Sequence, residues 1–286
     1  MSASNSVTDI LQAGARTLLH HSESPRLDAE LLLGKVLGLS RAALVAHDND
    51  PVTGDCERSY AGLIEQRMRG APVAYLTGIR EFWSLPLTVT PDVLVPRPET
   101  EVLVELALRL LPEREDCSIL DLGTGSGAVA LAIASERPRA QITAVDISPP
   151  ALGVATRNAT SLGLSRIQWR LGSWFDAVPG ERFDMIVANP PYVAAHDPAL
   201  AMLSAEPAIA LCPGATGLEA LRAIAASAPL HLHECGWLLL EHGRDQAADV
   251  ADLLGRHGFE AVCSHPDFSG RPRVTLGTLH TQHSQH

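Results

Sequence analysis

The sequence has 286 residues, of which 46% are hydrophobic and 19% are charged. This composition is typical of a folded chain with one large domain or two smaller ones, and it argues against a disordered or fibrous protein. The 33 acidic residues outnumber the 22 lysines and arginines, so the formal net charge is −11 and broad binding to a nucleic-acid backbone is not expected.

The sequence carries no pattern typical of a membrane or secreted protein. The longest apolar stretches, such as residues 127–134, are far shorter than the roughly 18 residues that a transmembrane helix needs. The N-terminus has no basic segment ahead of an apolar run. The five cysteines are scattered without a CxxC pair, which predicts neither a disulfide framework nor a zinc ribbon. We therefore expect a soluble, cytoplasmic protein without a metal site.

Residues 1–74 carry only helical signals. Thr8 or Asp9 is suited to cap the first helix, and Ser24 followed by Pro25 marks the start of the second. Because no strand pattern interrupts these segments, we predict a small N-terminal helical bundle.

The pattern changes in residues 75–97. Apolar side chains alternate with smaller or polar ones, and prolines interrupt the run. This predicts a β-hairpin linker. A helix is expected to begin near Glu99.

From residue 98 to residue 279, strand and helix signals alternate. Strands are predicted at 118–122, 141–147, 167–171, 183–188, 237–241, 259–263 and 273–279. Helices are predicted at 127–136, 150–162, 218–233 and 245–257. This alternation predicts an α/β fold with a doubly wound, mostly parallel sheet. The last two strands are joined by too short a segment for a helical crossover, so we expect them to pair antiparallel, followed by a disordered tail at 280–286.

A glycine-rich loop follows the first of these strands. The glycines let a ligand approach the backbone, and the helix that follows directs free N–H groups toward it. Asp146 ends the next strand, 146 − 123 = 23 residues after the first glycine, where a carboxylate can accept both hydroxyls of a ribose. The loop segment consists of Asp121, Leu122, Gly123, Thr124, Gly125, Ser126 and Gly127.

This loop alone leaves more than one interpretation open. The spacing of Gly123, Gly125 and Ala128 also satisfies a loose dinucleotide fingerprint, and a simple packing turn would need glycines too. Asp121 distinguishes the ligands, since its carboxylate would repel a pyrophosphate but attract the ammonium of an amino-acid-bearing cofactor. The sequence therefore favours S-adenosylmethionine.

Asn189, Pro190, Pro191 and Tyr192 directly follow the strand predicted at 183–188. This position is the carboxyl end of the sheet, where ligands bind in such folds. The two prolines remove N–H donors, and the asparagine offers a side-chain carbonyl, so the segment presents acceptors that can hold an NH2 group. An ordinary turn would explain a lone Asn-Pro pair, but not the whole tetrapeptide after an apolar strand.

Together these motifs resemble the class I S-adenosylmethionine-dependent methyltransferases and, more narrowly, the bacterial release factor glutamine methyltransferases (the HemK/PrmC family). The resemblance covers nearly the whole chain and implies an N-terminal helical domain, a hairpin linker and a seven-stranded catalytic sheet. One departure is that Ser204 and Ala205 stand where family members often carry a basic-aromatic pair. Further matching segments are residues 80–87, 95–101, 173–175, 206–207, 240–243 and 273–277.

The resemblance also implies how the cofactor is held. The loop Gly123–Gly127 would wrap the methionine end, with Asp121 near its ammonium. Asp146 would hold the ribose hydroxyls and Trp174 would border the adenine. Asn189 would contact both the cofactor and the substrate.

The implied substrate slot consists of Asn189, Pro190, Pro191 and Tyr192. An amide nitrogen is a poor nucleophile because its lone pair is delocalised, so two fixed acceptors on its hydrogens would orient it and stabilise the developing charge. We therefore predict no catalytic His or Cys, and we interpret Glu241 as part of a polar strand end. The linker side of the cofactor pocket would be closed by Arg97, Pro98 and Thr100.

The implied activity is N5-methylation of the glutamine in the Gly-Gly-Gln motif of peptide chain release factors, by a monomer that needs no nucleic acid. A ribosomal-protein glutamine is a close alternative substrate. A nucleic-acid amino group is a second alternative, which the acidic balance disfavours. A non-catalytic cofactor-binding module is a third, which the presence of Asp121 and Asn189 disfavours.

Overall fold

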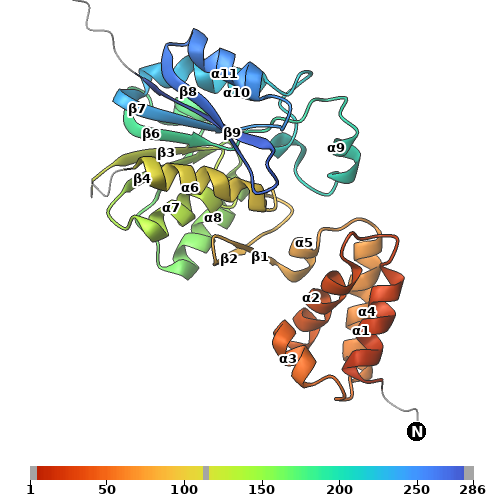
Figure 1. Cartoon of the computed structure of the whole chain (residues 1–286). Coiled ribbons are helices and arrows are strands. Elements are labelled where there is room, and N and C mark those ends of the chain that lie inside the picture. The colour runs from red at the N-terminus through yellow and green to blue at the C-terminus, as the bar shows by residue number, and fades with distance from the viewer. Residues whose placement is uncertain (1–4, 112–115, 280–286) are drawn as a thin grey trace, which may run out of the picture. The chain divides into compact units, whose positions relative to one another are not determined.

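The computed structural model describes residues 5–111 and 116–279. The chain divides into two compact units, Met1–Ile79 and Arg80–His286, whose elements are labelled in Figure 1. Within the described ranges, no helix has both the length and the apolar character that crossing a bilayer requires. The tail predicted to be disordered, residues 280–286, lies outside the described residues.

The first unit is helical. Ser6 is the N-cap of its first helix, because the Ser6 hydroxyl accepts from the backbone N–H of Asp9 at 3.2 Å and the Asp9 carboxylate accepts from the N–H of Ser6 at 3.1 Å. The predicted cap at Thr8 or Asp9 is therefore wrong, although Asp9 supplies the other half of the capping box. Leu11, Leu33 and Ile64 belong to the core of this unit. Its helices are α1 (Val7–Thr17), α2 (Pro25–Leu37), α3 (Arg41–Ala46), α4 (Gly54–Met68) and α5 (Val73–Thr77).

A β-hairpin follows, formed by β1 (Ile79–Phe82) and β2 (Leu85–Thr88). Its two-residue turn uses Trp83 and Ser84, whose φ values of 51° and 58° match the left-handed geometry that such tight turns favour. The hairpin is shorter than the segment 75–97 predicted for it, because α5 reaches Thr77 and the prolines beyond β2 interrupt further pairing. The chain then forms a short 3₁₀ helix, η1 (Pro98–Thr100), and α6 (Glu101–Leu110).

The second unit contains a seven-stranded sheet with the order β5-β4-β3-β6-β7-β9-β8. The first five strands in this order are parallel, and β9 runs antiparallel to both β7 and β8. This confirms the predicted doubly wound α/β fold with an antiparallel last strand. The strands are β3 (Ser118–Leu122), β4 (Gln141–Asp146), β5 (Gln168–Leu171), β6 (Phe183–Ala188), β7 (Leu232–Glu241), β8 (Phe259–Pro266) and β9 (Pro272–Leu279).

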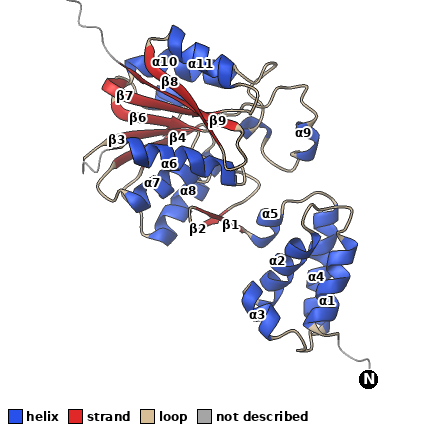
Figure 2. Ribbon diagram, in the orientation of Figure 1, coloured by secondary structure: helices blue, strands red, loops and turns tan. Residues whose placement is uncertain are grey.

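Helices cover both faces of this sheet, as Figures 1 and 2 show. On one face, α6, α7 and α8 cover a core that includes Ile119 and Val187. On the other, α10 and α11 cover a core that includes Leu120 and Ile186. Neighbouring residues of one strand thus serve opposite cores, as a two-sided sheet requires. The remaining helices are α7 (Ala128–Glu136), α8 (Pro149–Leu162), η2 (Trp174–Ala177), α9 (Ala199–Met202), η3 (Ala208–Ala210), α10 (Glu219–Ser227), η4 (Ala228–Leu230) and α11 (Ala247–Arg256).

The helix predicted at 218–233 is too long. The α-helix α10 ends at Ser227, and β7 already begins at Leu232. Pro229 explains the early end, since it has no N–H to continue the helix. The extra length of β7 contains a bulge in which Cys235 has a φ of 60°, and the register with β6 shifts there.

Candidate active site

The carboxyl ends of three parallel strands bring most of the predicted site together. β3 pairs with both β4 and β6, so the segments that follow these strands begin at the same edge of the sheet. A pocket of about 400 Å³ lies there. Six predicted site residues line it: Gly123, Gly125, Asp146, Trp174, Asn189 and Pro191.

The glycine loop bends sharply at this edge. Gly123, Gly125 and Gly127 have φ values of 73°, 56° and 83°, a conformation that favours glycine. The N–H groups of Gly123 and Thr124 both donate to the carbonyl oxygen of Val145, at 2.9 and 3.0 Å, which holds the loop against β4. A Cβ at Gly125 would meet no atom within 4 Å, so the loop backbone is open to the pocket at that residue.

Gly127 has a different reason to be glycine. A Cβ there would lie 3.1 Å from the Trp169 ring and 3.2 Å from the Cβ of Ala155. Gly127 therefore permits close packing of the loop on α8 and β5. Ser126, beside it, is buried, and its carbonyl accepts from the side chain of Asn158 at 2.9 Å.

Asp121 lies beneath the loop and is only 2% exposed. Its carboxylate accepts a hydrogen bond from the Thr124 hydroxyl at 2.6 Å. Burial raises the pKa of Asp121 to about 7, the Thr124 hydrogen bond opposes this rise, and the nearby charge of Asp146 adds to it. Asp121 is not among the residues that line the pocket.

Asp146 ends β4 and lines the pocket directly. One carboxylate oxygen accepts from the N–H of Gly125 at 2.8 Å, and the other accepts from the N–H of Ser148 at 2.9 Å. Burial raises the pKa of Asp146, and these two hydrogen bonds lower it. Because each carboxylate oxygen has two lone pairs, both can still accept from a ligand hydroxyl.

The Trp174 ring lies close to Gly123 of the loop. A Cβ on Gly123 would be 3.4 Å from the Trp174 ring. Trp174 itself has a φ of 46°, which is unusual for a bulky residue. Such a backbone is maintained only where the surroundings hold it, and here it places an aromatic ring in the pocket wall.

Asn189 follows β6 and faces the pocket. Its side-chain Nδ2 donates to the hydroxyl of Thr100 at 3.1 Å. The side-chain oxygen of Asn189 is therefore turned away from Thr100. Pro190 is buried behind it, and Pro191 lines the pocket.

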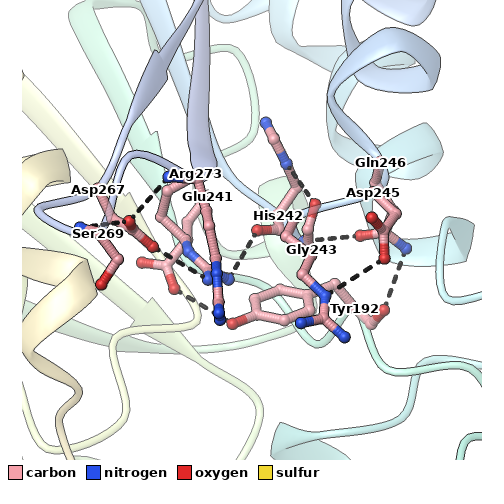
Figure 3. A network of polar contacts seen from close by, with 11 residues as sticks. Tyr192, Glu241, His242, Gly243, Asp245, Gln246, Asp267, Ser269 and Arg273 are labelled. Carbon is pink, nitrogen blue, oxygen red and sulfur yellow. Dashed lines mark hydrogen bonds and ion pairs between the residues drawn. The ribbon is translucent and has the colours of Figure 1, made fainter.

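Tyr192 is not among the pocket-lining residues. Its hydroxyl donates to Glu241 Oε1 at 3.3 Å, and its carbonyl oxygen accepts from Nε2 of Gln246 at 3.1 Å (Figure 3). The same glutamine accepts from the N–H of Gly243 at 2.8 Å. Tyr192 is thus fixed at both ends by the end of β7 and the segment that follows it.

Glu241 and Arg273 form the interior of the network in Figure 3. Glu241 is 1% exposed, and burial raises its pKa to about 7. Arg273 donates to the carbonyl oxygen of His242 at 3.2 Å and to the Asp267 carboxylate at 3.3 Å. The imidazole of His242 contacts the Thr275 hydroxyl at 2.8 Å, and burial lowers its pKa. These contacts agree with the interpretation of Glu241 as part of a polar strand end, here the end of β7.

The outer wall of the pocket comes from two segments that the motifs did not single out as pocket wall, residues 92–94 and 207–213. Arg97, Pro98 and Thr100, expected to close the pocket, are not among the residues that line it. Arg97 instead forms an ion pair with Glu206, and Thr100 is buried against Asn189. Ser204 and Ala205, which stand where family members often carry a basic-aromatic pair, are both exposed.

Asn158 of α8 is a further residue that the motifs did not single out. It is fully buried, and its side chain bonds both the N–H and the carbonyl of Thr88 as well as the carbonyl of Ser126. It therefore ties β2 to the glycine loop. A single asparagine in an amphipathic helix looks like a surface residue, so no local signal could have identified it.

Comparison with known proteins agrees with this geometry. Residues 9–78 match the family model described as the PrmC N-terminal domain, and residues 100–208 match the methyltransferase small domain. The release factor glutamine methyltransferase of Xylella fastidiosa (strain Temecula1) is 51% identical over 254 residues, which cover 88% of this chain and 92% of that protein. The chain belongs to the release factor glutamine methyltransferase family.

Other members of the family match over a similar length. The proteins of Salmonella typhimurium (strain LT2) and Escherichia coli (strain K12) are 46% and 45% identical over 261 residues, which cover 91% of this chain and 94% of each relative. Among solved structures, a methyltransferase from Pyrococcus furiosus has a TM-score of 0.53 at 18% identity, covering 69% of this chain and 90% of that one. This structure supports the fold alone. The family and the methyltransferase fold predicted from the motifs are confirmed.

Proposed function

We propose that this chain transfers a methyl group from S-adenosylmethionine to the side-chain nitrogen of the glutamine in the Gly-Gly-Gln motif of peptide chain release factors. Family membership supports this substrate. The observation that carries the chemistry is the hydrogen bond from Asn189 to Thr100, because it leaves the Asn189 carbonyl oxygen as an acceptor beside the glycine loop. On this proposal residues 98–279 form the catalytic domain and residues 1–74 a separate helical domain, joined by the linker 75–97.

The pocket residues fit S-adenosylmethionine. The carboxylate of Asp146 has free lone pairs for the ribose hydroxyls, Trp174 offers an aromatic face for the adenine, and the open backbone at Gly125 admits the methionine end. Asp121 supplies negative charge for the ammonium from beneath the loop. Among the described residues, no lysine or arginine lines this pocket.

Bound S-adenosylmethionine supplies an electrophilic methyl carbon on its sulfonium and leaves as the neutral thioether. The chain's own task is to make the glutamine nitrogen reactive. The side-chain oxygen of Asn189 and the backbone carbonyl of Pro190 accept the two amide hydrogens, which fixes the nitrogen and favours its pyramidal form.

These acceptors also stabilise the positive charge that builds on the nitrogen as the new N–C bond forms. The methylated nitrogen then releases one proton to water and regains a planar amide. No strong base is needed, because a positively charged amide nitrogen is acidic. The reaction therefore needs neither His242 nor a cysteine, and it belongs in the cytoplasm, where release factors act.

The test offers purified release factor, ribosomal protein and DNA in parallel, each with S-adenosylmethionine labelled on its methyl group. Label on the release factor, lost when its Gly-Gly-Gln glutamine is changed to alanine, supports the proposal. Label only on the ribosomal protein or only on DNA overturns it and selects one of the alternative substrates. Asn189→Ala is expected to abolish nearly all turnover by removing one of the two acceptors.

A further inference from the structure

The Gln246 side chain joins three segments that are far apart in the chain. Gln246 is the N-cap residue of α11. Its Nε2 donates to the carbonyl oxygen of Tyr192 at 3.1 Å and to that of Gly217 at 3.4 Å. Its Oε1 accepts from the N–H of Gly243 at 2.8 Å. Both ends of the carboxamide therefore have backbone partners of the matching kind, which fixes the way it is turned.

The backbones of these segments lie too close together to admit a further side chain. A Cβ on Gly217 would be 2.4 Å from the Tyr192 carbonyl oxygen, and a Cβ on Gly243 would be 3.0 Å from Oε1 of Gln246. Gly217 also has a φ of 76°, which favours glycine. The Tyr192 carbonyl is thus confined by the Gln246 amide and by the Gly217 backbone.

The Asn189–Tyr192 segment depends on such anchors for its position. Pro190 and Pro191 have no N–H, so neither residue can donate a backbone hydrogen bond to a neighbouring segment. The prolines make the segment stiff because they fix φ, but stiffness does not decide where the segment lies. At its carboxyl end, the bond from Gln246 to the Tyr192 carbonyl holds it in place.

We propose that Gln246 is a positioning residue for the methyl transfer, which sets the place of the amide slot through the Tyr192 carbonyl. This inference rests on the proposed function. Gln246 is not among the residues that line the pocket, and it bonds the chain two residues after Pro190, whose carbonyl accepts the substrate amide on that proposal. Because a misplacement of about 1 Å at the reacting atoms can cost about 100-fold in rate, an anchor this close to the slot affects kcat.

The bonded partners explain why this residue is a glutamine. A carbonyl oxygen needs a donor and a backbone N–H needs an acceptor, so the position requires a side chain that offers both. A glutamate in its place would only accept, and its carboxylate would face two carbonyl oxygens. A methionine has a similar length but no donor. Both substitutions therefore remove the bond to the Tyr192 carbonyl while the side chain stays long.

Gln246→Met and Gln246→Glu test this anchor. Both variants are expected to lower kcat for release factor methylation at saturating cofactor by on the order of 10- to 100-fold, because the Tyr192 carbonyl loses its donor. The Kd for S-adenosylmethionine is expected to stay within about threefold, since neither Gln246 nor the three residues that its carboxamide bonds line the pocket. A role in packing alone would leave kcat nearly unchanged in Gln246→Met, which fills a similar space.

Gln66→Met is the matched control. The Gln66 amide also donates to a backbone carbonyl, that of Gly62 at 3.3 Å, but it is exposed on α4. This variant is expected to keep the kcat and the cofactor affinity of the original chain.

Gly217→Ala displaces the same carbonyl from its other side, because the added Cβ would lie 2.4 Å from it. It is expected to lower kcat by about 10-fold or more. Gly180→Ala is its control, since Gly180 has a similar φ of 71° but a Cβ there would meet nothing within 4 Å. Gly217→Ala combined with Gln246→Met is expected to stay within about threefold of the less active single variant, because both changes displace one carbonyl.

Three results would overturn the inference. They are a kcat of Gln246→Met within about threefold of the original chain, a loss of cofactor affinity as large as the loss of kcat, and fully multiplied losses in the double variant. If Gly217→Ala does not fold, the comparison of Gln246→Met with Gln66→Met decides. All of these are measured against an active original chain. If that chain does not methylate release factors at all, the proposed function fails instead, so the two failures are distinguishable.

Discussion

Arg97 and Glu206 form an ion pair between two segments that are 109 residues apart in the chain. The Glu206 side chain is only 3% exposed, and its second oxygen accepts from the N–H of Val95 at 3.0 Å. Residues 92–94 and 207–213, which flank these contacts, both line the pocket. Glu206 therefore fastens the outer wall of the pocket together.

Glu206→Gln is expected to loosen this wall. The substitution leaves the Arg97 guanidinium, which is one-third exposed, without its charge partner, so the two segments of the wall are held together less firmly. We expect the Kd for S-adenosylmethionine to rise about 10-fold, with a smaller change in kcat at saturating cofactor. Isothermal titration calorimetry gives the Kd directly.

The matched control is Glu105→Gln, which breaks an exposed ion pair with Arg109 within one helix. Exposed ion pairs of this kind contribute little to the stability of the folded chain, so Glu105→Gln should bind S-adenosylmethionine normally. Equal binding by both variants would contradict the role assigned to Glu206.

Asp146→Asn is expected to weaken cofactor binding for two reasons. The amide can accept at only one end, so either Gly125 or Ser148 loses its acceptor, and the ribose hydroxyls lose a charged partner. We expect the Kd for S-adenosylmethionine to rise by 10-fold or more. Asp184→Asn serves as the control, because Asp184 also accepts a backbone N–H, from Ser118 at 2.8 Å, but is exposed at the other end of the sheet. An equal loss in both variants would indicate a general effect on the sheet.

Local patterns predicted the parts of this fold that depend on nearby residues. The strands β3 and β6 begin and end where their apolar runs do, and the glycine loop could be located because its three glycines are needed within five residues. The bulge at Cys235 could not be predicted, because it depends on how β7 meets β6. Pro229 is a signal for the end of α10, but apolar residues continue beyond it at helical spacing, so the predicted helix was extended too far.

The site residues divide in the same way, into those that local patterns identify and those that tertiary contacts determine. Asp146 and Asn189 could be selected because each lies at the carboxyl end of a predicted strand. The partner that orients Asn189 could not, since Thr100 is 89 residues away from it, and neither could the wall contact between Glu206 and Val95, which are 111 residues apart. Such contacts are decided by tertiary packing, which leaves no periodic trace in the sequence.

The raised pKa of Asp121 predicts that cofactor affinity depends on pH. The pKa is about 7 in the folded chain, so the carboxylate gains a proton as the pH falls from 8 to 6. Because the neutral form attracts an ammonium less, the Kd of the original chain is expected to rise severalfold over this range. Asp121→Asn should bind more weakly at pH 8 and show a smaller change with pH. An identical pH dependence in both proteins would assign the effect to another group.

The same residue predicts the direction of the stability change. The folded pKa lies above the ordinary value of 3.8, so the folded chain binds more protons than the unfolded chain between these values. The contribution of Asp121 to stability is therefore present at low pH and is lost as the pH rises through about 7. Asp121→Asn has no charge to bury, so its melting temperature relative to the original chain should be higher at pH 8 than at pH 6.

Gly127→Ala and Gly163→Ala separate backbone strain from steric exclusion. Both glycines have positive φ, 83° and 71°, so alanine at either position costs about 1–2 kcal/mol of strain. At Gly163 the added Cβ meets nothing within 4 Å, whereas at Gly127 it meets Leu131 at 3.0 Å and Trp169 at 3.1 Å. We expect Gly127→Ala to lose about 1–3 kcal/mol more of its free energy of unfolding than Gly163→Ala. Denaturant unfolding measures this difference. Because the clash also displaces the loop over Trp169, Gly127→Ala should weaken cofactor binding while Gly163→Ala should not, and equal losses in both variants would mean that the close packing at Gly127 is unimportant.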